Sequence, residues 1–143
     1  MARTIAKIMG VVFILVGILG FLAPGMLGMH LSLAHNLVHL ISGALALYFG
    51  FAGTLSGARL FCIIFGVVYG LLGVAGFLLG HGGSHGVAGV PAAHHGGGDS
   101  SLFAVLPGTL ELASMDHIVH ILLGLVFLIG GFLTRADLDR AVD

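Results

Sequence analysis

Two pairs of histidines stand inside long apolar runs, and their type and spacing could bind a cofactor. His35 and His39 are four positions apart in HNLVH, and His117 and His120 are three apart in HIVH. Either spacing places both rings on one face of a helix. Ionisable side chains are expensive in an apolar solvent. Because imidazoles bind haem iron and transition metals, the four histidines are candidate ligands of haem b, chlorophyll or a transition metal.

His39 and His120 are the stronger pair, because the stretch around one repeats around the other. The two positions are 81 residues apart (39 to 120), and Gly43 has its counterpart in Gly124 at the same separation. A repeated position predicts two imidazoles at one depth on two helices, both pointing inward. A structural role also accounts for them, since buried imidazoles form hydrogen bonds between membrane helices.

A second group of histidines lies in the segment 80–101, which is rich in glycine and has no helical period. We expect this segment to be a flexible loop on the outer side of the membrane. Imidazoles in such a loop are candidate ligands of Zn or Cu, although a flexible loop favours weak binding over a dedicated site. The candidate metal ligands are His81, His85, His94 and His95.

The composition is that of a membrane protein. Hydrophobic residues make up 58% of the 143 residues and charged residues 8%, against roughly 25% charged residues in soluble proteins. Four apolar segments are long enough to cross a bilayer, which takes about 20 helical residues. They are 5–22, 32–52, 58–79 and 115–133. The sequence therefore predicts an all-α integral membrane four-helix bundle in a single domain, 1–143.

All the basic residues fall at the termini or between the second and third segments. By the positive-inside rule these regions are cytoplasmic, so we expect both termini inside a bacterial inner (cytoplasmic) membrane. The histidines all fall on the opposite side or in the outer halves of the helices. The basic residues are Arg3, Lys7, Arg59, Arg135 and Arg140.

The chain also predicts a duplicated helical hairpin. Residues 10–21 (GVVFILVGILGF) match residues 66–77 (GVVYGLLGVAGF) at seven of twelve positions. Glycines recur along the helices, and small residues allow membrane helices to approach closely. The glycines expected at such contacts are Gly10, Gly17, Gly43, Gly66, Gly70, Gly73 and Gly124.

The pattern HNLVHLISG, the flanking glycine-rich helix and the second copy HxVHxxLG resemble a bacterial family of small four-helix membrane proteins of unknown function. Asn36, His39, Gly43, His120 and Gly124 fit the pattern. His117 departs from it, since asparagine is expected there, and the loop 80–101 is unusually rich in histidine. The resemblance implies a four-helix membrane protein and no activity.

These observations favour a non-catalytic protein, a structural or accessory subunit of a membrane complex. Its expected partners are the lipid bilayer and either other membrane subunits or further copies of itself. The alternative is a cofactor protein that uses His39 and His120. An enzyme is not expected, because carboxylates are few and no Ser-His-Asp set or phosphate-binding glycine motif is present. No basic patch suggests nucleic-acid binding.

Overall fold

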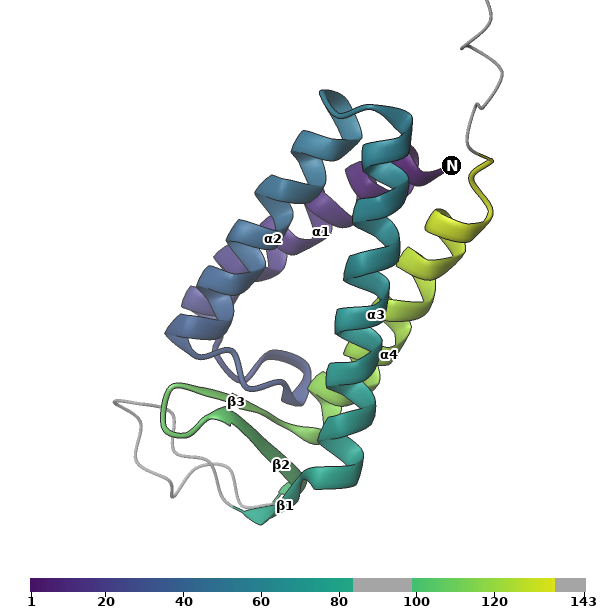
Figure 1. Cartoon of the computed structure of the whole chain (residues 1–143). Helices are drawn as coiled ribbons and strands as arrows, with labels where there is room; N and C mark the ends of the chain where they lie inside the picture. Colours follow the sequence, from purple (N-terminus) through teal and green to yellow (C-terminus); the bar gives the residue numbers. More distant parts are fainter. Residues whose placement is uncertain (84–98, 136–143) are drawn as a thin grey trace, which may run out of the picture.

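The computed structural model describes residues 1–83 and 99–135, and four long helices dominate it (Figure 1). Each helix is long and apolar enough to cross a membrane. They pack against one another, which confirms the predicted all-α four-helix bundle. The helices are α1 (Ala2–Leu22), α2 (Leu33–Phe51), α3 (Leu55–Leu79) and α4 (Ser114–Phe132).

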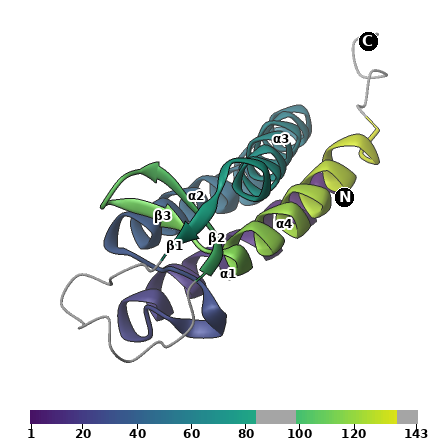
Figure 2. The ribbon, with the colours of Figure 1, turned by 90° about the horizontal axis from the view of Figure 1, so that it is seen from below.

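The helices pack in two pairs. The most extensive contacts join α1 to α2 and α3 to α4. The two pairs lie close together near the N-terminus and diverge toward the opposite end (Figures 1 and 2). Aromatic rings fill the space between the pairs. The ring of Phe13 on α1 lies 5.3 Å from that of Tyr69 on α3 and 6.0 Å from that of Phe127 on α4, between centroids.

The face of α2 that carries His35 and His39 is buried, and the opposite, apolar face is exposed. Leu37 and Ile41 are 46% and 61% exposed, as expected of side chains that contact lipid. Amide and imidazole groups turn inward because lipid offers them no hydrogen-bond partner. The buried residues of α2 are His35, Asn36, His39, Ser42, Gly43, Ala46 and Gly50.

Glycines bring the paired helices to close range. A Cβ atom added to Gly73 would lie 2.6 Å from the carbonyl oxygen of His117, and one added to Gly124 would lie 2.6 Å from the backbone nitrogen of Gly70. Gly70 differs, because a Cβ atom on it would meet no atom within 4 Å. Its backbone, not its missing side chain, forms the contact with Gly124. Gly10, Gly17, Gly43 and Gly66 also contact side chains or backbone of the partner helix.

Two helix starts are capped by hydroxyl groups. The Ser32 hydroxyl accepts a hydrogen bond from the backbone N–H of His35 at 3.3 Å, and the Thr54 hydroxyl accepts one from that of Gly57 at 3.0 Å. The second cap starts α3 three residues before the predicted residue 58. Side-chain oxygens at this position satisfy N–H groups that have no partner within the helix.

The segment 80–101, expected to be a loop throughout, has short strands at both ends. β1 (His81–Gly83), β2 (Asp99–Leu106) and β3 (Leu110–Leu112) form an antiparallel sheet in the order β1-β2-β3. Pro107 and Gly108 make the turn between β2 and β3, with Gly108 at a φ of 72°. Such short strands carry too little alternation of apolar and polar residues to stand out in a chain that is apolar nearly everywhere.

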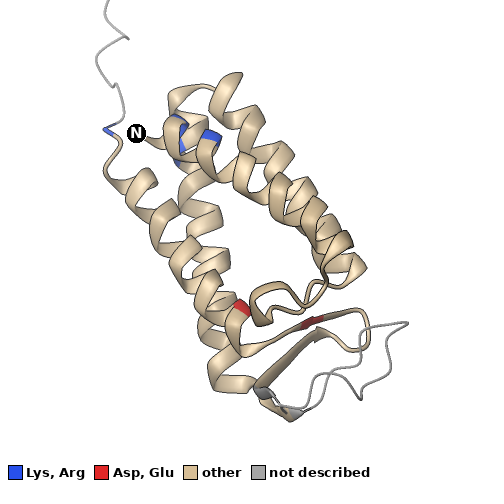
Figure 3. Cartoon of the chain, turned by 180° about the vertical axis from the view of Figure 1, so that it is seen from behind, with Lys and Arg blue, Asp and Glu red and all other residues tan. Residues whose placement is uncertain are grey.

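Charged side chains separate along the molecule (Figure 3). At the end that holds the N-terminus, the guanidinium of Arg3 donates to the carbonyl of Gly53, and the Nε of Arg59 donates to the carbonyl of Gly131 at 3.1 Å. Asp116 and Glu111 lie at the opposite end, near the sheet. Among the residues that the structure describes, the two ends of the bundle therefore differ in charge.

Candidate functional site

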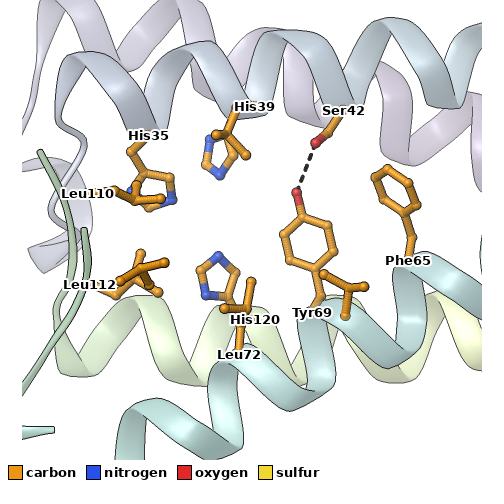
Figure 4. Close-up of a pocket in the computed structure, with 12 residues that line it drawn as sticks. His35, His39, Ser42, Phe65, Tyr69, Leu72, Leu110, Leu112 and His120 are labelled. Carbon is orange, nitrogen blue, oxygen red and sulfur yellow. Dashed lines mark hydrogen bonds between the residues drawn. The ribbon is translucent and has the colours of Figure 1, made fainter.

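Three of the four candidate histidines meet between the helix pairs. His35 and His39 project from successive turns of α2 toward His120 of α4 (Figure 4). Each ring offers a nitrogen that lies within 4.8 Å of those of the other two. The side chains are only 3%, 5% and 4% exposed, respectively. The structure thus adds His35 to the predicted pair of His39 and His120.

The ring nitrogens of this cluster differ in their hydrogen bonds. Nδ1 of His35 lies 2.8 Å from the carbonyl oxygen of His30. A carbonyl only accepts, so Nδ1 carries the proton and donates it, and the lone pair is left on Nε2. Nδ1 of His39 and Nδ1 of His120 are buried and have no hydrogen-bond partner among the described residues. Buried polar atoms usually have a partner, so these two nitrogens call for an explanation.

A cavity of about 180 Å³ opens beside the three rings. Its remaining wall is mostly apolar and comes from α2, α3 and the sheet, which contributes Val105 on β2 and Leu110 and Leu112 on β3. Pockets for drug-sized ligands and cofactors measure about 300–1,000 Å³, whereas a cavity of about 150 Å³ holds a molecule the size of benzene. The space suits a small ligand.

Aromatic neighbours hold the rings in place. The ring centroid of Phe13 lies 5.6 Å from that of His39, and that of Tyr69 lies 5.3 Å from that of His120. The Tyr69 hydroxyl donates to the Ser42 hydroxyl at 3.2 Å, which joins α3 to α2 beside the histidines, to their right in Figure 4. Sequence reasoning missed Tyr69. The available signal was a phenol on an otherwise apolar helix, at the position where the first copy of the repeat has Phe13.

A protein-family model described as Domain of unknown function (DUF4383) matches residues 3–96. The chain belongs to this family. The match includes α1, α2 and α3, and therefore His35 and His39, but it ends before α4 and His120. No curated protein and no solved structure matches the chain. The sequence resembles a family of membrane proteins of unknown function. The family match and the four apolar helices agree with this resemblance.

His117 of this DUF4383 chain lies outside the cluster, against the neighbouring helix α3. Its Nε2 donates to the carbonyl of Ser101 at 2.7 Å, and its ring meets that of Phe77 edge-on at 5.2 Å. The ring fills the space over Gly76, where a methyl group would collide with it. His117 is fully buried, and these contacts give it a packing role that ties β2 to α4.

Both carboxylates whose side chains are described bind backbone groups. Asp116 is 1% exposed, and its Oδ2 accepts from the N–H of Ala113 at 2.8 Å and of His30 at 2.9 Å. Glu111 accepts from the N–H of Gly108 at 2.8 Å. Neither side chain lines the cavity. The acids of the DUF4383 chain that the structure describes thus stabilise turns at the end of the bundle that carries the sheet.

The predicted loop site is only partly visible. His81 lies on β1 and is exposed. His85, His94 and His95 fall outside the described residues. Metal binding by these four histidines stays a prediction.

Proposed function

We propose that the protein is a non-catalytic integral membrane protein, a structural or accessory subunit of a complex in the bacterial inner membrane. The main support for this proposal is the pair of hydrogen bonds that Asp116 accepts. Asp116 is the one fully buried carboxylate that the structure describes, and it joins the loop after α1 to the start of α4 by accepting from the backbone N–H groups of His30 and Ala113. General acid–base catalysis requires a side chain within hydrogen-bond reach of the reacting group. A carboxylate already bound by two N–H groups is better placed to hold a scaffold together.

The alternative of a haem b or chlorophyll between His39 and His120 has less support. A planar macrocycle needs more space than the cavity of about 180 Å³ beside these rings, since cofactor pockets begin at about 300 Å³. The helix pairs would have to move apart, and the aromatic contacts of Phe13 and Tyr69 with the two histidines would be lost.

We further propose that the bundle arose from a duplicated hairpin, and equivalent contacts in the two helix pairs support it. Sites in α1 and α3 are related by 56 residues (10 to 66) and sites in α2 and α4 by 81 (47 to 128). Gly10 packs on Leu47 as Gly66 packs on Leu128. Asn36 lies over Gly20 as His117 lies over Gly76. The departure from asparagine at position 117 thus keeps the same packing role.

A pull-down tests the role as a subunit. The chain, carrying a C-terminal peptide tag without histidine, is extracted from native membranes with a mild detergent. We expect one further membrane protein, or additional copies of the chain, to be recovered at fixed stoichiometry by quantitative mass spectrometry. A similarly tagged membrane protein of equal size controls for carry-over. Recovery of a monomer alone, both in detergent and in polymer-bounded native discs, would contradict the proposal.

The orientation of the bundle gives a second prediction. The end that carries Arg3, Lys7 and Arg59 should face the cytoplasm, because basic residues are retained there. In a background with Cys62→Ala, a cysteine at the exposed Thr109 should react with an impermeant maleimide added to intact cells. A cysteine at the exposed Ser56 should react only after the membrane is opened. The reverse pattern would show the opposite orientation.

A further inference from the structure

We propose that His35, His39 and His120 bind one transition-metal ion with a filled d shell, and that this ion is Cu(I) rather than Zn²⁺. Three features of the cluster support this assignment: the spacing of the ring nitrogens, their hydrogen bonds, and the uncharged surroundings. None of them depends on the structural role proposed above.

The three imidazoles are close enough to share one ion. Their ligand nitrogens lie within 4.8 Å of one another, while two nitrogens bound to one tetrahedral ion at about 2.05 Å lie about 3.3 Å apart. Small side-chain rotations bring all three into bonding range. His35 and His39 also have the four-residue spacing by which a single helix presents two imidazoles to one metal.

A hydrogen bond orients the ring of His35 for metal binding. Histidines that bind a metal almost always donate their other ring N–H to a carbonyl or carboxylate, which fixes the tautomer and the ring orientation. His35 has this arrangement, with Nδ1 donating to the carbonyl of His30 at 2.8 Å. Nδ1 of His39 and Nδ1 of His120 form no hydrogen bond with the described residues, so an ion bound between the rings would break no existing hydrogen bond of these two atoms.

The surroundings decide which ion fits best. Among the described residues, the lining of the cavity contains no carboxylate or thiolate. Three neutral imidazoles do not neutralise the charge of the ion. Placing an uncompensated charge in an apolar environment carries a free-energy penalty. This penalty grows with the square of the charge and is about four times smaller for Cu(I) than for Zn²⁺. Imidazole ligands suit both ions, so the charge of the ion decides between them.

The test uses the full chain, purified in detergent through a tag without histidine. Cu(I), kept reduced with ascorbate, is titrated in competition with a coloured Cu(I) chelator, and Zn²⁺ is titrated separately. We expect one equivalent of Cu(I) to bind at least ~10-fold more tightly than Zn²⁺. The substitutions His39→Gln and His120→Gln should each weaken Cu(I) binding by at least ~100-fold, more than the loss of an outer-shell partner. Copper K-edge absorption should show three nitrogen ligands at about 2.0 Å.

A matched control replaces the outer histidines His81, His85, His94 and His95 together by glutamine. This variant should still bind one equivalent of Cu(I) as tightly as the wild-type protein does. Thermal unfolding gives a second measure of binding: Cu(I) should raise the melting temperature of the wild-type protein, whereas it should not raise that of His39→Gln above the value of the metal-free variant. Tight binding that disappears in the outer variant, or persists in both single variants, would overturn the site. Tighter binding of Zn²⁺ than of Cu(I) would overturn the choice of ion.

Discussion

Replacing Gly73 by leucine is expected to lower the free energy of unfolding of the bundle by about 3 kcal/mol or more. Overpacking a close contact costs typically 1–3 kcal/mol, and more where the neighbour cannot move. The neighbours here include backbone, since a Cβ atom on Gly73 would lie 2.6 Å from the carbonyl oxygen of His117 and 2.9 Å from the backbone nitrogen of Ile121. Helices α3 and α4 must separate to admit a side chain. Unfolding in mixed micelles, followed by circular dichroism, measures the change.

Gly70→Leu, one turn away on the same helix, is the matched control. A Cβ atom at this position would meet no atom within 4 Å. Leucine also has a higher helix propensity than glycine, by up to about 1 kcal/mol. We therefore expect the Gly70 variant to unfold at or slightly above the wild-type midpoint. Equal destabilisation by the two substitutions would show that the contact between α3 and α4 is placed wrongly.

Asp116→Ala should destabilise the protein by about 2–6 kcal/mol, the second of the two largest effects expected. The substitution removes the acceptor of two buried bonds, from the N–H of Ala113 and that of His30. Each buried donor that loses its partner costs about 1–3 kcal/mol. Because one of these bonds starts α4 and the other holds the loop after α1, the end of the bundle next to the sheet should loosen first. Hydrogen exchange followed by mass spectrometry should show faster exchange at both segments.

Two further variants test whether the effect of Asp116→Ala comes from the lost hydrogen bonds or from the lost negative charge. Asp116→Asn keeps an oxygen that accepts hydrogen bonds, and it should destabilise the protein less than alanine does. Glu111→Ala removes a single bond at an exposed N–H group, which water replaces, so its effect should stay below about 1 kcal/mol. An effect of Glu111→Ala as large as that of Asp116→Ala would contradict the linking role assigned to Asp116.

The amino-acid sequence was enough to predict the helices and their faces. Hydropathy marks four spans, and the period of 3.6 residues places His35, His39 and Ser42 on one side of α2, the side that is buried. Both signals are local, because a membrane helix satisfies its own backbone and must turn its polar groups away from lipid. Helix ends were less accurate, since caps such as Thr54 depend on a single hydroxyl.

Only the tertiary structure determined which residues the buried face of each helix contacts. His35 and His117 had equal standing in the sequence, yet His35 joins His39 and His120, whereas His117 turns to Gly76 and Ser101. Helical periodicity is a property of one segment. The depth and rotation at which α2 faces α4 depend on the glycine contacts within each pair and on the aromatic rings between the pairs. Those contacts join residues far apart in the chain, so only the assembled bundle brings three imidazoles together.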